Sequence, residues 1–415
     1  MPTTPIASSI VEKLVQAGHK AYFAGGWVRD FLMNRPSDDI DIATSATVEE
    51  IQSLFPKTIP VGIAFGIVIV VEQNHQFEVA TFRKDEGYID GRRPSLISSA
   101  TAEEDAQRRD FTINGMFYDP ITKELFDYVG GKKDLEKGII KAIGNAHERF
   151  LEDRLRMMRA VRYSTRFNFP IESDTLQAIL SHAESLLPAV AHERIWQEFK
   201  KMSQYEHFDT GLVILHKLKL LPTIFPSLSQ MTLEEIQQRV SCIEHYPKKA
   251  PTIAQLLELF PDNNLENHLQ LCEYLKLSNQ DKDFTRYLYT LKKTLSSHEE
   301  KIIIVEPIEW AYLYANNYSD ICIKIIASRF PPEKREYFID YHFKKMQLLE
   351  QAILRIRSSS PVVRSVDLIH EGVKPGKHMG LLLKEAERIS VNENLDDRNE
   401  ILRMLKQTPL WESCS

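Results

Sequence analysis

Hydrophobic positions in the first 150 residues recur with two periods, one typical of strands and one typical of helices. β-Branched and alternating runs predict strands at Ala21–Ala24, Ile40–Ala43, Gly66–Glu72 and Phe77–Phe82. Helical spacing predicts helices at about Pro5–Ala17 and Val28–Met33. The turn-like residues 73–75 separate the last two predicted strands, so we expect these strands to flank a turn.

The pattern changes near residues 145–151. Glycines are dense up to Gly144 and then rare until Gly372, with Gly211 as the exception. Helical spacing dominates beyond this point, first at Leu151–Phe167, Ser173–Ser181 and Glu193–Lys201 and then to the C-terminus. The sequence therefore predicts a mixed α/β head followed by an all-helical remainder.

The overall composition adds little to this prediction of the fold. A chain of 415 residues is too long for one core, and 43% hydrophobic with 27% charged residues is ordinary for a globular protein. No apolar run could cross a bilayer and no secretory signal is visible, so we expect a cytoplasmic protein without membrane contact. The four cysteines lack metal or disulfide spacing. A net charge of −6 leaves nucleic-acid binding open, because a local basic stripe suffices for it.

The strongest chemical signal is the acidic motif of residues 38–41. Asp39 and Asp41 alternate along the predicted strand, so their side chains are expected on one face. Two carboxylates so placed repel each other unless a divalent cation lies between them, and oxygen ligands suit Mg²⁺. Glu78, on the next predicted strand but one, is a candidate third carboxylate. A solvated acidic turn is the alternative for the aspartate pair, and an edge position is the alternative for Glu78.

A Gly-Gly turn precedes this motif by about fifteen residues. Gly25 and Gly26 follow one predicted strand and open a helix, which lets the backbone approach a phosphate closely. Arg29, one turn later, is placed to neutralise that phosphate. The turn alone is weak evidence, but turn and aspartate pair together predict phosphoryl transfer from a metal-bound triphosphate.

These motifs belong to an ordered series. The chain carries GGWVRD, DDIDIAT, EVATFR, EGYIDGRRP, EEDAQRRDFTINGM, LEDRLRMMRAVRY and ERIWQEF in that order. From residue 20 to about 202 it closely resembles the bacterial class II tRNA nucleotidyltransferases and their poly(A) polymerase relatives. Residues 371–380 are similar to a segment of that family's C-terminal tail. From the sequence, this segment is a turn that enters a helix, with lysines available to phosphate.

The resemblance implies a polymerase-beta-like head at 1–150, a nucleotide-selecting neck at 151–205, a helical body at 206–350 and a tRNA-binding tail at 351–415. It implies Asp39 and Asp41 as metal ligands, with Mg²⁺ as the cofactor. The residues that it implies at the nucleotide are Gly26, Arg29, Arg109, Asp110, Asn114, Asp153, Arg156, Arg159 and Arg162, to which we add Gly25. Asp110 and Asn114 are expected towards the ribose. The implied partners are CTP, ATP and the acceptor and T arms of tRNA; no feature points to a protein partner.

Asp153 and Arg156 are expected to choose the base. They lie three residues apart in the predicted helix, so a surface salt bridge is the ordinary interpretation. The resemblance implies a sharper role. Cytosine and adenine place an amino donor beside a ring-nitrogen acceptor, which suits a carboxylate beside a guanidinium, whereas uracil and guanine reverse this order. Glu198 and Arg194, in the ERIWQEF motif, are expected to brace this helix.

The predicted function is therefore addition of C, C and A to the 3′ end of tRNA. Poly(A) polymerase is the nearest alternative, although residues 61–68 resemble the tRNA enzymes and no long basic tail follows. A second alternative is an inactive RNA-binding relative. The loop Glu86–Pro94 matches the segment implicated in switching from C to A addition, and Ser95, where a glutamate is common, is a departure there. Trp27 and Gly115 also depart from the family pattern.

Overall fold

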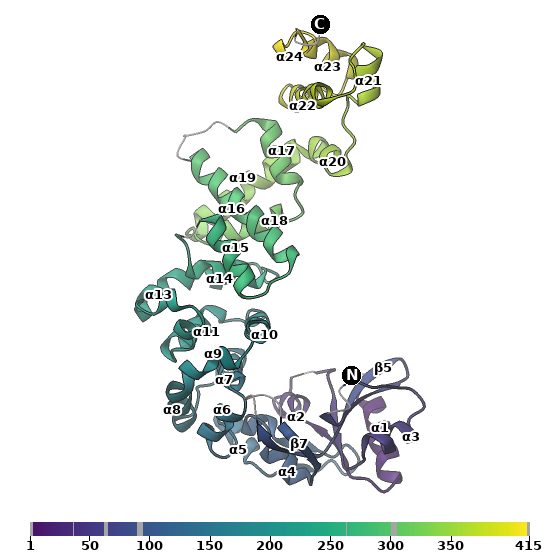
Figure 1. The fold of residues 1–415 in the computed structure, drawn as a ribbon, viewed down its shortest axis with the longest axis vertical. Helices are drawn as coiled ribbons and strands as arrows, with labels where there is room; N and C mark the ends of the chain where they lie inside the picture. Colours follow the sequence, from purple (N-terminus) through teal and green to yellow (C-terminus); the bar gives the residue numbers. More distant parts are fainter. Residues whose placement is uncertain are drawn as a thin grey trace. The chain divides into compact units, whose positions relative to one another are not determined.

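The computed structural model describes residues 3–35, 37–61, 65–88, 94–262, 264–299 and 305–412. The chain divides into two compact units, Met1–Val240 and Ser241–Ser415 (Figure 1). The first holds the mixed sheet and the helices that follow it, and the second is helical. The predicted order of an α/β head and a helical remainder is thus confirmed. The finer division at 150, 205 and 350 stays a prediction.

The first unit is built on a seven-stranded mixed sheet. Its order is β3-β4-β5-β2-β1-β8-β9, in which only β2 and β5 run parallel. The strands are β1 Ala21–Ala24, β2 Asp41–Thr44, β3 Thr58–Ile59, β4 Ile67–Glu72, β5 His75–Thr81, β8 Met116–Tyr118 and β9 Leu125–Asp127. The four predicted strands are present with ends shifted by at most two residues, while β3, β8 and β9 are too short to give a clear period.

Alternation along the strands gives this sheet two different faces. Phe23, Ile42 and Val79 are fully buried in a core with α1 (Thr3–Gln16) and α3 (Val48–Leu54). Their neighbours in sequence, including Asp41 and Glu78, therefore point to the opposite face. The same strands that supply the core thus carry polar side chains on their other side.

Nine of the other helices and short helical turns in the described part of this unit lie between β1 and residue 217. They are α2 Gly26–Leu32, α4 Ala102–Gln107, η2 Thr112–Asn114, α5 Gly131–Lys137, α6 Ala146–Glu152, α7 Leu155–Phe167, α8 Ser173–His182, α10 His192–Met202 and α11 Phe208–Lys217. The helices predicted at 5–17, 28–33, 173–181 and 193–201 are confirmed as α1, α2, α8 and α10. Each end lies within two residues of its predicted position.

The single helix predicted at Leu151–Phe167 is wrong. The structure divides this segment between α6 and α7, and Asp153 between them has an extended backbone, with φ −143° and ψ 105°. Its Oδ1 accepts the N–H of Leu155, the first residue of α7, at 3.0 Å. An aspartate that satisfies a free N–H at a helix start favours a break there, although the hydrophobic spacing continues through it.

The predicted loop Glu86–Pro94 is also partly wrong, because its two ends belong to strands. β6 Arg83–Tyr88 and β7 Pro94–Ser99 pair as an antiparallel ribbon. Residues 89–93, the centre of the predicted loop, lie outside the described residues, as do residues 62–64 of the segment 61–68.

The second unit consists of helices and contains its own core. Its α-helices are α14 Thr252–Leu256, α15 Leu265–Tyr274, α16 Asn279–Glu299, α17 Pro307–Ala315, α18 Ser319–Ala327, α19 Pro332–Leu348, α20 Glu350–Ser358, α21 Ser365–His370, α22 Lys377–Asn392, α23 Arg398–Leu405 and α24 Pro409–Glu412. Residues 363–405 contribute a compact apolar cluster that includes Leu368, Leu382 and Ile401. The turn predicted within residues 371–380 does lead into a helix, α22. Over the described ranges, no helix combines the length and apolarity that a membrane crossing requires.

Candidate active site

A cavity of about 960 Å³ opens on the polar face of the sheet in the first unit. All thirteen site residues predicted from the sequence line it, so the structure brings together positions from Gly25 to Arg162. Its charged lining consists of six carboxylates, Asp30, Asp39, Asp41, Glu78, Asp110 and Asp153, and ten cations, Arg29, Arg83, Arg108, Arg109, Arg156, Arg159, Arg162, Arg166, Arg194 and Lys201. This excess of cations suits a polyanionic ligand such as a triphosphate.

Three carboxylates gather at the sheet side of the cavity. Asp41 in β2 is directly paired in register with Glu78 in β5, a strand in the interior of the sheet and not at its edge. Asp39 lies two residues before β2, in an irregular segment, so the predicted strand alternation does not itself place it. Burial, followed by the charges of Glu78 and Asp39 and opposed by Arg109, raises the pKa of Asp41 to about 7. Burial and Asp39 likewise raise the pKa of Glu78.

These carboxylates fit a hard divalent cation. A carboxyl group whose pKa rises because of its neighbours' negative charge is relieved when a cation binds among them. Among the described residues, however, no group of three or more His, Cys, Asp or Glu side chains is arranged to hold a metal ion by itself. The donors therefore fit a cation such as Mg²⁺ that takes one or two protein carboxylates and completes its shell with phosphate and water oxygens.

The Gly25-Gly26 turn lies against the side chain of Arg109. Gly25 has φ +65° and ψ −125°, a conformation that side chains disfavour, and a Cβ there would lie 3.0 Å from Nη1 of Arg109. Arg109 donates two hydrogen bonds to Oδ2 of Asp105, from Nε at 3.1 Å and from Nη2 at 2.9 Å, and its guanidinium lies over the ring of Phe117. Because Gly25 has no side chain, the guanidinium of Arg109 can lie next to the turn. A Cβ at Gly25 would also lie 3.8 Å from Oδ2 of Asp41, so this space borders the carboxylate as well.

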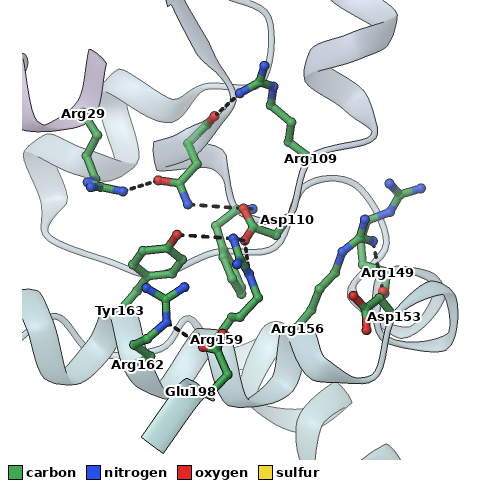
Figure 2. A network of polar contacts seen from close by, with 12 residues as sticks. Arg29, Arg109, Asp110, Arg149, Asp153, Arg156, Arg159, Arg162, Tyr163 and Glu198 are labelled. Atoms are coloured by element: carbon green, nitrogen blue, oxygen red, sulfur yellow. Dashed lines mark hydrogen bonds and ion pairs between the residues drawn. The ribbon is translucent and has the colours of Figure 1, made fainter. Parts of the chain in front are cut away.

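A chain of polar contacts connects the turn's helix to α7 (Figure 2). Arg29 in α2 is only 2% exposed, and its Nη1 donates to Oδ1 of Asn114 at 2.5 Å. Nδ2 of Asn114 donates to Oδ1 of Asp110 at 3.2 Å. Oδ2 of Asp110 accepts Nε of Arg159 at 2.8 Å, and Arg159 also donates to the hydroxyl of Tyr163 at 3.3 Å. Each contact fixes the orientation of the next side chain.

Asp110 is the centre of this chain. Its carboxylate is buried and also accepts the N–H of Phe111 at 2.8 Å. Burial raises its pKa, but the charge and hydrogen bond of Arg159 and the hydrogen bond of Asn114 outweigh burial and lower the pKa to about 2. Asp110 is therefore ionised and engaged by protein groups. Its predicted place near the ribose, like that of Asn114, stays a prediction.

Asp153 and Arg156, both drawn in Figure 2, line the cavity, but each is held by another residue. Asp153 Oδ2 accepts Nη2 of Arg194 at 2.9 Å. Arg156 donates to Glu152 at 2.6 Å and to the carbonyl oxygen of Arg108 at 3.0 Å. Within the described contacts no hydrogen bond or ion pair joins the side chains of Asp153 and Arg156. The salt bridge that is the ordinary interpretation of their spacing is thus absent there.

The brace predicted for the ERIWQEF motif is confirmed. Glu198 is 2% exposed and accepts Nε of Arg162 at 2.6 Å, while Arg194 holds Asp153 from the same helix, α10. Sequence reasoning nevertheless missed that Arg194 lines the cavity. Arg166, whose spacing after Arg159 and Arg162 predicts a basic stripe that contacts phosphate or pairs with carboxylates, also lines the cavity and donates to Asp30 at 2.9 Å. No local signal distinguishes Arg194 from a surface residue, because its partner Asp153 lies 41 residues away.

Comparisons with known proteins agree with this geometry. Residues 21–141 match the poly A polymerase head domain, and residues 168–231 match the family described as the probable RNA and SrmB-binding site of polymerase A. The CCA-adding enzyme of Streptococcus mutans is 33% identical over 411 residues, which is 97% of this chain and 96% of that protein. The chain belongs to the CCA-adding enzyme family.

Other members support this placement. The CCA-adding enzyme of Streptococcus pyogenes is 32% identical over 94% of this chain and 93% of its own length. The crystal structure of the Bacillus stearothermophilus CCA-adding enzyme in complex with CTP superimposes with a TM-score of 0.80, at 28% identity and over 98% of both chains. The Thermotoga maritima enzyme complexed with tRNA shares the fold, with a TM-score of 0.66 at 19% identity. The polymerase-beta-like head expected from the sequence is that of this family.

Proposed function

We propose that this protein transfers C, C and A in turn from CTP and ATP to the 3′ end of tRNA, with release of pyrophosphate. One observation carries the proposal: a single cavity places three carboxylates on its sheet side and a connected set of arginines on α2, α7 and α10. A binding module has no need for carboxylates that raise each other's pKa at such a cost. The relatives named above carry the same activity in their names.

Asp39 and Asp41 are proposed to hold the divalent cation, with Mg²⁺ as the ion and Glu78 as a neighbouring catalytic carboxylate. When bound, such a cation lowers the pKa of an attacking hydroxyl and stabilises charge on a leaving pyrophosphate. The carboxylates contribute by orienting the 3′ hydroxyl of the RNA towards the α-phosphate. Asp41 at the start of β2 is best placed for this, because β1 and β5 fix its backbone on both sides.

The triphosphate is proposed to lie between the Gly25-Gly26 turn and the arginines. Arg109 sits beside Gly25 and is partly exposed, so it is available to phosphate oxygens. Arg29 has three protein hydrogen-bond or ion-pair contacts and is buried, so it would act mainly through its charge and through Asn114. Arg159 and Arg162 are proposed to face the nucleotide from α7.

Choice of base is proposed to rest on Asp153 and Arg156. Separate partners, Arg194 and Glu152, hold the two side chains, so acceptor and donor keep a fixed order in the cavity. A base whose ribose and phosphates are held elsewhere cannot turn over to match that order. Cytosine and adenine then satisfy both groups, while uracil and guanine leave both unpaired.

The second unit is proposed to hold the acceptor and T arms of tRNA, and the cytoplasm is the proposed location. Poly(A) polymerase remains the alternative function, because its relatives share the head domain. An inactive RNA-binding relative is disfavoured by the intact carboxylates.

The test supplies tRNA that ends before CCA with CTP alone, with ATP alone, or with both. We expect two nucleotides with CTP alone, three with both, and no long tract with ATP alone. Long A tracts would favour poly(A) synthesis. The Asp41→Asn variant is expected to lose at least about a thousandfold in incorporation rate, while Asp119→Asn, at a turn outside the cavity, should retain it. Full incorporation by Asp41→Asn would contradict the assignment of the cation site.

A further inference from the structure

Two aromatic side chains of α7 lie among the arginines of the cavity in the first unit. Tyr163 and Phe167 are four residues apart on the helix, and their rings stack at an interplanar angle of 6° with centroids 6.2 Å apart. Tyr163 lines the cavity and is 7% exposed, and Phe167 is 5% exposed. Membership of the apolar stripe of α7 is the ordinary interpretation of this burial.

The ring of Tyr163 contacts three guanidinium groups. The Cζ atoms of Arg162, Arg29 and Arg159 lie 4.3, 5.4 and 5.7 Å from the ring centroid. Arg29 belongs to α2, and the other two arginines belong to α7. The hydroxyl of Tyr163 also accepts Nη2 of Arg159 at 3.3 Å (Figure 2). All of these centroid distances are within the range, up to about 6 Å, in which an aromatic ring attracts a cation.

Phe167 has similar surroundings one turn later. The Cζ atoms of Arg29, Arg166 and Arg35 lie 4.7, 4.9 and 5.4 Å from its ring centroid. Arg29 therefore contacts both rings. Together with the ion pair between Arg166 and Asp30, this contact joins α2 to α7. The two rings contact five arginines in all, namely Arg29, Arg35, Arg159, Arg162 and Arg166.

The rings attract these arginines without neutralising them. In the described contacts three carboxylates, Asp30, Asp110 and Glu198, pair with four of the five arginines. Three negative charges do not balance five positive ones, so an excess of positive charge remains. A further carboxylate would hold a guanidinium but also cancel its charge. An aromatic ring attracts the guanidinium through its quadrupole and leaves the charge available to a polyanion.

We propose that Tyr163 and Phe167 are positioning residues of the triphosphate site, whose rings keep the arginines of α2 and α7 in place while leaving their charge to the phosphates. This inference rests on the proposed function, because it takes the polyphosphate of a nucleotide as the ligand of these arginines. It differs from a packing role in a way that can be measured. A packing role depends on the volume of the side chains, whereas this role depends on the electrons of their rings.

The experiment titrates the full-length chain with inorganic tripolyphosphate by calorimetry, without RNA and without divalent cations, so that the arginines account for binding. Tyr163→Phe keeps the ring and removes the hydroxyl. Phenylalanine analogues with increasing numbers of ring fluorines are then incorporated at position 163, because fluorine weakens the negative face of the ring and changes its size little. Tyr163→Leu and Phe167→Leu remove one ring each. Phe208→Leu is the matched control, because Phe208 is a buried ring of α11, which packs on α7, and lies outside the cavity lining.

We expect Tyr163→Phe to bind tripolyphosphate within about threefold of wild type, and binding to weaken with each added fluorine until the loss reaches about tenfold. Tyr163→Leu and Phe167→Leu should lose about tenfold, and Phe208→Leu should stay within about twofold of wild type. The KM for CTP should rise in parallel, while kcat changes by less than about threefold.

An affinity for tripolyphosphate that does not depend on the number of fluorines would overturn the proposal. Equal losses in Tyr163→Leu and Phe208→Leu would overturn it as well, since they would indicate packing alone. The fluorinated series preserves the shape of the side chain, so it tests the proposal even if Tyr163→Leu does not fold. Because these titrations involve no nucleotide transfer, their failure is distinguishable from a failure of the chain to add C, C and A.

Discussion

Replacing Asp110 by asparagine would remove one negative charge from the centre of the arginine network without changing the side chain's size. Asp110 is 9% exposed and holds Arg159 through its Oδ2, with hydrogen bonds from Asn114 and from the N–H of Phe111 at Oδ1. The variant can still accept hydrogen bonds, but its amide no longer balances the guanidinium of Arg159. The cost is therefore mainly electrostatic.

The pKa of Asp110 gives the magnitude. Its fall from 3.8 to about 2 corresponds to about 2 kcal/mol, at about 1.36 kcal/mol per pKa unit. Because the folded-state pKa is below the unfolded-state value, this stabilisation is fully present above about pH 4 to 5. It is lost as the pH falls through about 2, where the carboxyl group becomes protonated in both states. The difference between wild type and Asp110→Asn should follow the same course.

The assay must measure the first unit alone, because unfolding of a chain with two units is not two-state. Urea-dependent hydrogen exchange, read by mass spectrometry on peptides from residues 102–202, meets this need. At pH 7 the free energy of unfolding should fall by about 2 kcal/mol, and this difference should shrink to about half at pH 3. Asp174→Asn, an exposed residue of α8, should change it by less than about 0.5 kcal/mol. A negligible loss at pH 7, or a loss that stays constant down to pH 3, would refute the reasoning.

Three further predictions concern the cavity. Because the pKa of Asp41 is about 7 before a cation binds, binding of Mg²⁺ should displace about one proton per chain at pH 6 and far fewer at pH 8. Calorimetry in buffers of different ionisation enthalpy measures the number of protons released. Equal proton release at both pH values would count against this assignment of Asp41. Gly25→Ala should lower the free energy of unfolding of the first unit by about 1–3 kcal/mol in the same hydrogen-exchange assay, since φ is +65° and the new Cβ meets Arg109, while Gly26→Ala, whose Cβ has only ordinary contacts, should be nearly neutral. Arg156→Ala should reduce the preference for CTP over UTP, as the ratio of kcat/KM, about tenfold or more while changing the KM for CTP less; an equal loss with all four nucleotides would argue against its pairing role.

The sheet and its polar face could be predicted from the sequence because both follow from a period of two. Ile42 and Val79 mark the buried face, and this leaves Asp41 and Glu78 on the other. The cavity lining could also be foreseen, because the motifs that carry it recur in a known order. Local sequence patterns therefore predict most of the fold of the first unit and the types of residue that line its cavity.

The partners of these residues could not be predicted. Asp153 ends α6 where hydrophobic spacing continues, so the break depends on a capping hydrogen bond that no periodicity reports. Its pairing with Arg194, and that of Glu198 with Arg162, join residues 41 and 36 positions apart. Such contacts arise when α7 and α10 pack together, and packing is a property of the tertiary structure. A smaller cavity of the helical unit has the same origin, because its lining comes mainly from three separate helices.

The proposed activity requires that this chain adds C, C and A without a template and in that order. The most direct measurement incubates tRNA that lacks its CCA end with all four nucleoside triphosphates at equal concentration and sequences the 3′ ends of the products. We expect nearly all extended molecules to end in a single CCA. Products that end in A tracts, or that contain U or G at appreciable frequency, would contradict it.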